Sequence, residues 1–211
     1  MSTATRPPVP DPTPWRELWQ TSQTPWDQAG PHPELPRLLK HAQLEGGLKP
    51  GEAIYSGGVG RAHNEAALAR AGYHVKAVDF VPEAIAAAQE IYREVVGLEL
   101  LSADAFHVTA EEEGRFAAIF DRAMLCALQP EARTSYLQAS LARLQAGGLW
   151  MGILFRSVSR PDGPPFAIDE STASSLFTQD FDLCFAGACS PRPGMNPGTE
   201  EWLCVWRRRA S

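Results

Sequence analysis

The stretch from Ala53 to Asp79 decides the fold class of this chain. It opens with the apolar run Ala53-Ile54-Tyr55, turns at Gly57-Gly58-Val59-Gly60, and continues into an alanine- and leucine-rich segment, 64–71, that stops at Gly72. A second extended run then ends in Asp79. A strand, a glycine turn, a helix followed by a glycine and a second strand are typical of a βαβ unit, whose strands are parallel and whose crossover is right-handed.

The same alternation of extended and helical patterns continues outside this unit. Helical and extended patterns alternate from Leu35 onward, with helices expected over 82–95, 137–144 and 169–177, and strands over 98–101, 116–120, 149–155, 181–186 and 202–208. Parallel strands joined by helices form an open, twisted sheet with helices on both faces. We therefore predict an α/β fold with a doubly wound, mostly parallel sheet, formed by one domain over residues 15–211.

Proline and tryptophan set the N-terminal segment apart. Nine of the 18 prolines precede Lys40, so no single regular element fits there, and residues 1–14 are expected to form a disordered arm. Residues 15–36 carry Trp15, Trp19 and Trp26 among polar residues and prolines. Because a linker has little use for large indole rings, this segment is expected to dock on the rest of the protein.

Composition disfavours several classes of function. A net charge of −6 over 211 residues does not suit a nucleic-acid partner, which needs clustered Lys and Arg. The longest charge-free apolar stretch, 147–155, is too short to span a bilayer, and no signal sequence is evident. The four cysteines (Cys126, Cys184, Cys189 and Cys204) show no CxxC pairing. We expect a cytoplasmic monomer without a metal, membrane or nucleic-acid partner.

The glycine loop and Asp79 predict a nucleoside site. Gly58 and Gly60 lie between a strand and a helix, where a missing Cβ allows positive φ and lets a ligand approach the backbone. Asp79 lies 19 residues beyond Gly60 at the end of the second strand, where a carboxylate can accept hydrogen bonds from both ribose hydroxyls. Two ligand-free interpretations stay open: a tight turn for the glycines, and a helix N-cap before Pro82 for Asp79.

Two further acids follow the next two strands. Asp104 is placed to accept from an adenine amino group with Ala105 against the ring, and Asp121 is expected to face the same cleft. A dinucleotide site requires a third glycine where this chain has His63. S-adenosylmethionine has no phosphate and does not need that glycine. Acids at three successive strand ends therefore favour a cationic sulfonium cofactor over an anionic pyrophosphate.

Several segments, in order along the chain, resemble one known family. Trp15-Arg16-Glu17-Leu18-Trp19 and Thr24-Pro25-Trp26-Asp27-Gln28 are similar to the N-terminal signature of plant thiol/halide methyltransferases, and 57–64 is similar to their glycine loop. Asp121-Arg122-Ala123-Met124-Leu125-Cys126-Ala127-Leu128 and Gly163-Pro164-Pro165-Phe166 resemble segments of bacterial members and thiopurine methyltransferases. From about Trp15 to Arg208 the chain therefore resembles the thiopurine/thiol/halide methyltransferase family.

This resemblance implies a fold, a cofactor and residue roles. It implies a Rossmann-like, seven-stranded sheet with an antiparallel C-terminal strand, and S-adenosylmethionine as a methyl donor used without a metal. Residues 15–36 would form a lid, and the acceptor pocket would be lined by Trp26, Arg122, Pro165 and Phe166. The residues implied to contact the cofactor are Trp15, Trp19, Trp26, Gly58, Gly60, Asn64, Asp79, Asp104, Ala105, Asp121 and Arg122. The acceptor would be a small soft nucleophile: a thiol, thiopurine, halide or chalcogen species.

Asn64 departs from the family pattern and keeps alternatives open. The family has an acid there that helps hold the amino-acid end of the cofactor, whereas an amide brings no charge. A relative that binds the cofactor with little or no turnover is therefore one alternative, and a nicotinamide-dependent oxidoreductase is another. Purely structural interpretations are a packed helix face for Trp15 and Trp19, and an ion pair with a nearby acid for Arg122.

Overall fold

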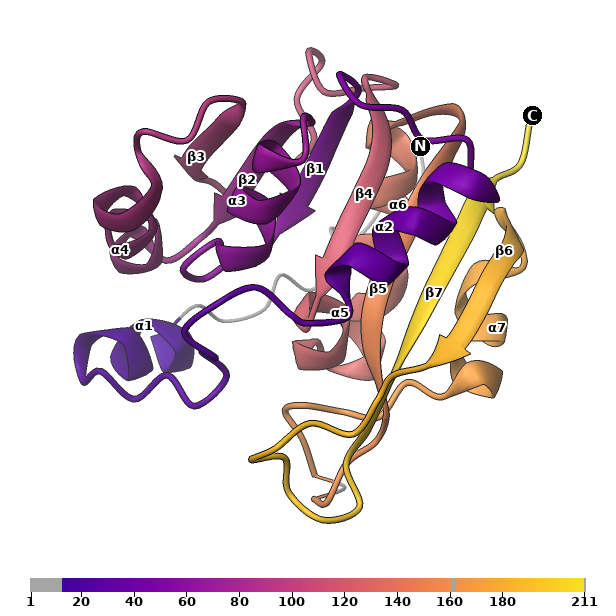
Figure 1. Ribbon diagram of the computed structural model, residues 1–211. Helices are drawn as coiled ribbons and strands as arrows, with labels where there is room; N and C mark the ends of the chain where they lie inside the picture. Colours follow the sequence, from indigo (N-terminus) through magenta and orange to yellow (C-terminus); the bar gives the residue numbers. More distant parts are fainter. Residues whose placement is uncertain (1–12, 161, 211) are drawn as a thin grey trace, which may run out of the picture.

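A seven-stranded sheet forms the centre of the computed structural model, which describes residues 13–160 and 162–210 (Figure 1). The strand order is β3-β2-β1-β4-β5-β7-β6. Neighbouring strands from β3 to β5 are parallel, and β7 is antiparallel to both β5 and β6. The predicted fold class is thus confirmed. The strands are β1 (Ala53–Gly57), β2 (His74–Asp79), β3 (Leu98–Ser102), β4 (Phe116–Arg122), β5 (Leu144–Ser157), β6 (Phe181–Ala188) and β7 (Glu200–Arg208).

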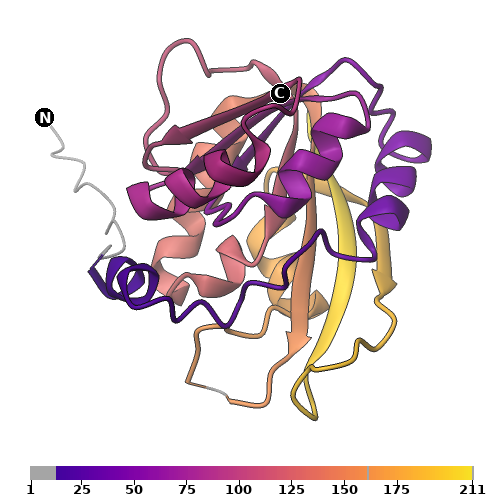
Figure 2. The ribbon, with the colours of Figure 1, turned by 60° about the vertical axis from the view of Figure 1, so that its left-hand side comes forward.

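Helices cover both faces of this sheet (Figures 1 and 2). On one face α2 (Leu35–Leu44) and α3 (His63–Arg70) bury leucines such as Leu38 and Leu68 in one core cluster, with α4 (Pro82–Tyr92) beside them. On the other face α5 (Met124–Ala127), α6 (Pro130–Arg143) and α7 (Glu170–Phe177) bury aromatic rings such as Tyr136 and Phe177 in a second cluster. The remaining helix, α1 (Thr13–Gln20), lies outside these layers, near α4.

The βαβ unit predicted from the sequence is present. Ile54 and Val75 are parallel register partners in β1 and β2, and α3 forms the crossover between these strands. Gly72 follows the helix with φ of +94°, the left-handed conformation that ends many helices. The sheet order reverses between β1 and β4, which creates a switch point at the carboxyl ends of these strands.

Several predicted boundaries differ from the structure; the helix expected over 82–95, for example, ends at Tyr92. Leu144 was expected to close a helical stripe, yet α6 ends at Arg143, and Leu144 begins β5 as the fully buried partner of Phe116. Tertiary burial in the sheet therefore outweighs the helical spacing of the leucines. The arm over 1–14 and the lid over 15–36 stay predictions; Thr13 and Pro14 lie in α1, and Leu35 and Pro36 lie in α2. Residues 1–12 of the predicted arm lie outside the described residues.

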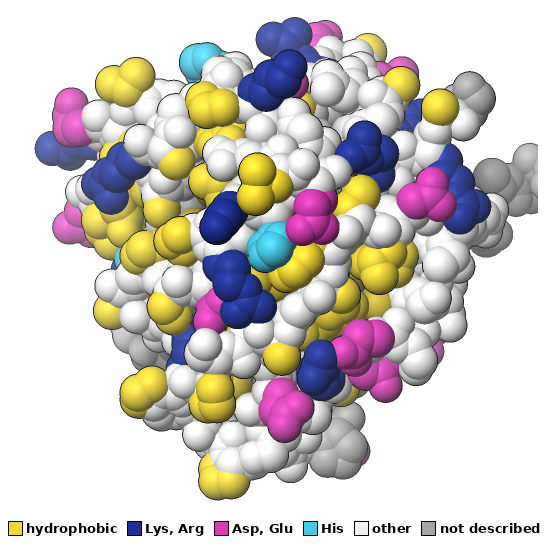
Figure 3. Space-filling view, turned by 45° about the vertical axis from the view of Figure 1, so that its right-hand side comes forward, with side chains coloured by type: hydrophobic (Ala, Val, Ile, Leu, Met, Phe, Trp, Pro, Cys, Tyr) yellow, Lys and Arg dark blue, Asp and Glu magenta, His cyan; other side chains and the backbone are white. Residues whose placement is uncertain are grey.

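No helix among the described residues is long and apolar enough to cross a membrane. On the face shown in Figure 3, Lys and Arg side chains lie interspersed with Asp and Glu. This face therefore carries no single basic patch of the kind that binds a phosphate backbone.

Candidate functional site

The loops after β1, β2, β3 and β4 meet at one edge of the sheet (Figure 1). In the glycine loop after β1, the Gly58 N–H donates to the Val78 carbonyl across 2.8 Å. Gly58 and Gly60 have φ of +66° and +54°, a region that glycine adopts without strain. A Cβ on Gly58 would lie 2.6 Å from Met124 Sδ. The structure therefore requires glycine at this position.

Asp79 holds the glycine loop against β2. Its carboxylate is 6% exposed and accepts hydrogen bonds from the N–H groups of Gly60 and Val81, each at 2.9 Å. Burial raises the pKa of Asp79, and these two hydrogen bonds only partly oppose the rise. The helix-cap interpretation of Asp79 is wrong, because the N-cap of α4 is Val81 and no side chain makes a capping hydrogen bond there. The bond to Gly60 instead links the ends of two strands.

The loop after β3 lies against the glycine loop. Asp104 is half-buried and its Oδ1 accepts from the Phe106 N–H at 2.9 Å, which leaves Oδ2 for a ligand. Ala105 is buried, and a Cβ placed on Gly57 would lie 2.8 Å from the Ala105 Cβ. Asp104 and Ala105 are thus brought beside the glycine loop, at the edge where the nucleoside site was predicted.

Asp121 differs from the expectation that it faces the cleft. It is fully buried, and its carboxylate accepts from the Tyr136 hydroxyl at 2.9 Å and from the Leu125 N–H at 3.1 Å. These donors turn the carboxylate inward under α5, so Asp121 is not exposed to a ligand. Burial raises the pKa of Asp121 to about 6.

Glu65 is a buried acid that sequence reasoning missed. It lies in the first turn of α3, is 3% exposed, and accepts from the Ser56 hydroxyl at 2.8 Å. Burial raises the pKa of Glu65 to about 7, with the charges of Asp121 and Asp79 acting in the same direction. Three acids are therefore buried around the glycine loop. Such an arrangement favours a cation over an anion at this edge.

Arg122 belongs to a charged cluster whose other members were not predicted. Its Nη2 donates to Glu201 Oε1 at 2.6 Å, and its guanidinium lies 5.0 Å from the centre of the Phe155 ring. Arg192 also binds Glu201, with Nε at 2.8 Å from Oε2 and Nη2 at 2.9 Å from Oε1. The buried Nη1 of Arg122 has no hydrogen-bond partner among the described residues. The ion-pair interpretation of Arg122 is thus correct in part, although its acid is a buried one.

His32 completes this cluster as a neutral donor. The Glu34 N–H donates to His32 Nδ1 at 3.1 Å, so the ring proton is on Nε2, which lies 3.0 Å from Glu201 Oε2. Burial lowers the pKa of His32, and Arg122 and Arg192 act in the same direction against Glu201. Burial alone would raise the pKa of Glu201, but His32 and the two arginines lower it to about 2. Two guanidinium cations therefore share the one carboxylate of this cluster.

No sequence signal marks Glu201 or Arg192 as members of this cluster. Glu201 stands beside another glutamate at the start of an apolar strand, where an exposed acid is the ordinary interpretation. Its burial depends on the antiparallel position of β7 beside β5, which local sequence patterns do not specify.

The side chain of Asn64 binds the backbone of the N-terminal segment. Its Oδ1 accepts a hydrogen bond from the His32 N–H at 2.7 Å. The amide that replaces the family's acid thus joins α3 to the segment that precedes α2.

The three N-terminal indoles lie together over the glycine loop. The rings of Trp15 and Trp26 have centroids 5.2 Å apart, and those of Trp19 and Trp26 6.4 Å apart. A Cβ placed on Gly60 would lie 3.6 Å from Trp19 Cζ2 and 3.9 Å from Trp26 Nε1. None of the residues of α1, all of which the structure describes, is buried. The indoles therefore cover the loop without belonging to the core.

Asp27, which was not singled out in the sequence, fastens this segment. Its carboxylate binds Arg61 Nε and lies 3.1 Å from His63 Nε2, while His63 Nδ1 lies 2.6 Å from the Tyr92 hydroxyl. Burial raises the pKa of Asp27, but hydrogen bonds from Ala29, Arg61 and His63 outweigh burial, and the net pKa is lowered. An ionised Asp27 therefore links the segment to both α3 and α4.

The predicted acceptor-pocket loop lies against α5. The Phe166 N–H donates to the Cys126 carbonyl at 2.7 Å, and the Arg133 guanidinium lies 5.4 Å from the centre of the Phe166 ring. Pro165 is exposed beside it. Trp26, by contrast, has Trp15 and Trp19 as its ring neighbours. The structure thus places Phe166 beside α5, whereas Arg122 pairs with Glu201 of β7 and Trp26 lies over the glycine loop.

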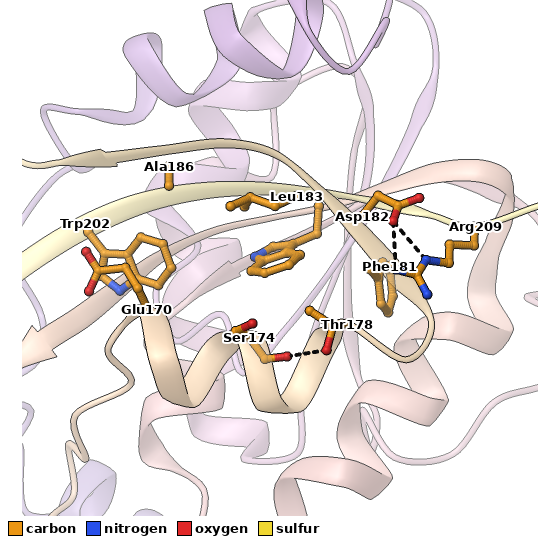
Figure 4. A pocket seen from close by; sticks show the side chains of 10 residues that line it. Glu170, Ser174, Thr178, Phe181, Asp182, Leu183, Ala186, Trp202 and Arg209 are labelled. Atoms are coloured by element: carbon orange, nitrogen blue, oxygen red, sulfur yellow. Dashed lines mark hydrogen bonds and ion pairs between the residues drawn. The ribbon is translucent and has the colours of Figure 1, made fainter.

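A separate hollow of about 270 Å³ lies between α7 and the strands β6 and β7 (Figure 4). Two of its polar groups are engaged: Thr178 donates to the Ser174 carbonyl at 2.8 Å, and Trp202 donates to the Ile168 carbonyl at 2.8 Å. The Nε1 of Trp206, which also lines the hollow, has no hydrogen-bond partner among the described residues. None of the predicted site residues lines this hollow. The candidate site therefore stays at the glycine-loop edge.

Comparison with known proteins shows that this chain matches one protein family. The family model described as thiopurine S-methyltransferase matches residues 10–189. Among curated proteins, the chain is 29% identical over 161 residues to thiocyanate methyltransferase 1 of Arabidopsis thaliana, covering 75% of this chain and 68% of that protein. It is 25% identical over 210 residues to thiopurine S-methyltransferase of Acinetobacter baylyi, covering 91% and 95%.

Solved structures share the fold. A 1,6-didemethyltoxoflavin-N1-methyltransferase from Burkholderia thailandensis, solved with 1,6-didemethyltoxoflavin and S-adenosylhomocysteine bound, has a TM-score of 0.70 and 19% identity, covering 97% of this chain and 93% of that chain. The N-methyltransferase NodS from Bradyrhizobium japonicum, solved with S-adenosylhomocysteine, has a TM-score of 0.70 and 16% identity, covering 92% and 97%. At these identities the likeness concerns the fold alone.

Proposed function

Since this chain belongs to the thiopurine S-methyltransferase family, it is an S-adenosylmethionine-dependent methyltransferase, and we propose that its acceptor is a small, soft nucleophile that binds as an anion. Thiolates, thiopurine anions, halides and chalcogen anions share this character. The observation that carries the proposal is the buried Nη1 of Arg122, which has no hydrogen-bond partner among the residues that the structure describes, in a cluster where two arginines share one carboxylate.

The residues around the glycine loop fit the cofactor. A carboxylate has about four acceptor sites, and Asp79 uses two of them for Gly60 and Val81, so two remain for ribose hydroxyls. Asp104 would accept from the adenine amino group through Oδ2. The buried acids beneath the loop favour a ligand with positive charge. When bound, S-adenosylmethionine supplies an electrophilic methyl group on a cationic sulfur.

The charge of the Arg122 cluster favours an anionic acceptor. Burial lowers the pKa of Arg122 and Glu201 opposes this shift, but a guanidinium stays protonated in proteins. An anion at Nη1 would supply both the missing hydrogen bond and the missing negative charge, which an uncompensated buried cation requires. A neutral acceptor would supply neither charge nor a comparably strong acceptor.

In this proposal the cofactor side and the acceptor side of the site carry opposite charges. Acids lie beneath the cofactor side and the arginine cluster lies on the acceptor side, so each side holds one charged reactant. Methyl transfer neutralises the sulfonium cation and the anionic acceptor. The electrostatic attraction of each side for its ligand is then lost, which favours release of both products. A thiolate or halide needs no general base, so the residues contribute by orienting the reactants and excluding water. Trp19 and Trp26 are the proposed water-excluding lid.

The location proposed for this enzyme is the cytoplasm. Its four cysteines are free thiols in the structure, and disulfides are rare in that reducing compartment.

Variants at Arg122 test the acceptor assignment. We expect wild-type protein to release labelled S-adenosylhomocysteine with iodide, hydrosulfide or a small thiol. Arg122→Met should lower kcat/KM for these acceptors by about tenfold or more, as loss of a charged hydrogen bond does, while S-adenosylhomocysteine affinity changes little. Arg122→Lys should recover part of the loss. An unchanged kcat/KM in Arg122→Met would remove Arg122 from the acceptor pocket.

A further inference from the structure

Arg143 is a buried cation at the end of α6 that points at the loop after β3. It is 1% exposed, and its Nη1 donates to the Ala105 carbonyl at 2.7 Å while its Nη2 donates to the His107 carbonyl at 2.5 Å. The two carbonyls stand two residues apart in the same short loop. One planar guanidinium therefore holds both ends of the turn that follows Asp104.

Arg143 is itself held in place from two other elements. Its Nε donates to Glu112 Oε2 at 2.9 Å, and its guanidinium lies 4.1 Å from the centre of the Tyr55 ring on β1. Glu112 also pairs with Lys76 Nζ at 2.7 Å, on β2. Burial raises the pKa of Glu112, but Lys76 and Arg143 outweigh it and lower the net value. The guanidinium thus connects α6, β1 and the loop after β3 rigidly.

We propose that Arg143 is a positioning residue for adenine recognition: it fixes loop 104–107 so that the Asp104 carboxylate meets the exocyclic amino group of the cofactor. This inference rests on the proposed cofactor site. Asp104 Oδ1 accepts a hydrogen bond from the Phe106 N–H, so the direction of Oδ2 depends on the position of the loop backbone. That backbone is set by Arg143 on one side and by the Ala105–Gly57 contact on the other.

Lysine cannot replace arginine in this role. Its ammonium is a compact point charge, whereas the guanidinium is a planar fork whose donors diverge to separate acceptors. Arg143→Lys therefore keeps the charge opposite Glu112 but cannot bind both carbonyls in the observed geometry. It is also a milder change than Arg143→Met, which removes the donor to Glu112 Oε2 and to both carbonyls and leaves Glu112 only Lys76.

A ratio of affinities separates positioning from simple stabilisation. S-inosylhomocysteine differs from S-adenosylhomocysteine in having an oxygen where adenine has its amino group. We expect wild-type protein to prefer S-adenosylhomocysteine by about tenfold or more, as loss of a hydrogen bond to a charged group implies. A variant that merely folds less well loses affinity for both ligands equally, so the ratio stays unchanged.

The experiment is calorimetric titration of both ligands with folded wild-type, Arg143→Lys and Arg143→Met. In both variants we expect the preference for S-adenosylhomocysteine over S-inosylhomocysteine to fall towards the value for Asp104→Ala. If Arg143→Met does not fold, Arg143→Lys alone tests the proposal. Lys76→Met is the matched control: it removes the other partner of Glu112 and should keep the wild-type ratio. A wild-type ratio in folded Arg143→Lys and Arg143→Met overturns the role of Arg143 while the cofactor assignment stands. Failure of wild-type protein to bind S-adenosylhomocysteine overturns both.

Discussion

The Asp79 carboxylate accepts a hydrogen bond from the Gly60 N–H across 2.9 Å, and so joins the end of β2 to the glycine loop after β1. We expect Asp79→Ala to weaken S-adenosylhomocysteine binding at least tenfold, because it removes the ribose acceptor and releases the loop. Two backbone donors would also lose a buried partner, at a cost of about 1–3 kcal/mol each. Calorimetric titration measures the first effect and chemical denaturation the second.

Asp182→Asn is the control for this prediction, because Asp182 is an exposed acid on β6. It should change neither affinity nor stability. Unchanged affinity in Asp79→Ala would remove the ribose assignment.

Asn64→Asp tests the departure from the family's glycine loop. The carboxylate would keep the hydrogen bond from the His32 N–H and add a negative charge near the proposed amino-acid end of the cofactor. We expect affinity for S-adenosylmethionine to be preserved or improved. Asn64→Ala should instead cost about 1 kcal/mol of stability, since it loses the bond to His32. Loss of binding in a folded Asn64→Asp protein would show that this loop holds the cofactor differently.

Glu65→Gln should make stability less dependent on pH. Burial raises the pKa of Glu65 to about 7 from an ordinary 4.5. Below pH 4.5 the carboxyl is protonated in both states. As pH rises from 4.5 to 7, the unfolded state releases this proton before the folded state does, so stability falls. Glutamine does not titrate and can still accept from Ser56, so we expect it to add about 1–3 kcal/mol at pH 7.

Urea unfolding at pH 4.5 and pH 7 checks this prediction. Asp121, whose pKa burial raises to about 6, acts in the same direction, so some pH dependence should remain in the variant. Glu131→Gln, a change at an exposed residue of α6, should leave the wild-type profile as it is. The prediction is contradicted if the free energy of unfolding falls between pH 4.5 and pH 7 by the same amount in Glu65→Gln as in wild type.

Trp26→Ala should lower turnover more than stability. Trp26 is half-buried and packs on Trp15 and Trp19 above Gly60, so it excludes water from the proposed transfer path without filling the core. Core aromatic truncations cost about 3–5 kcal/mol, and we expect a loss well below that range. Turnover with saturating cofactor and thermal melting of the cofactor-free protein measure the two effects.

Hydrogen exchange over residues 15–26 tests whether this segment acts as a lid. Asp27 binds Arg61 and His63 and so fastens the segment. Exchange in the segment should therefore be slow while these ion pairs are formed, and slower still when S-adenosylhomocysteine is bound. Asp27→Asn should speed exchange in the ligand-free protein. A collapse of the melting temperature in Trp26→Ala, or exchange that the ligand leaves unchanged, would indicate permanent packing instead.

Local sequence patterns predicted much of the fold. Gly58, Gly60 and Gly72 mark turns that require positive φ, and this chemistry is local to each residue. Asp79 and Asp104 were predicted as site residues because parallel strands end at one edge of the sheet, so the loops that follow these strands lie together. The antiparallel end of the sheet followed from the family resemblance rather than from any local pattern.

The remainder depends on contacts between distant segments. Glu201 follows Arg122 by 79 residues and faces it only because β7 inserts beside β5. Asp121 turns inward because Tyr136 on α6 offers a hydroxyl. Leu144 joins the sheet rather than the helix because Phe116 is its partner there. In each case a partner from another element decides the outcome, and the sequence around the residue does not contain that partner.

The pH dependence of kcat/KM for a thiol, measured beside that for iodide, tests the anionic-acceptor proposal most directly. If the acceptor binds as an anion, kcat/KM for the thiol should rise about tenfold per pH unit below the thiol pKa and level off above it, since only the thiolate reacts. Iodide is an anion throughout, so its profile reports any titration of the enzyme itself and should lack this rise. A thiol profile parallel to that of iodide across the thiol pKa would contradict the account.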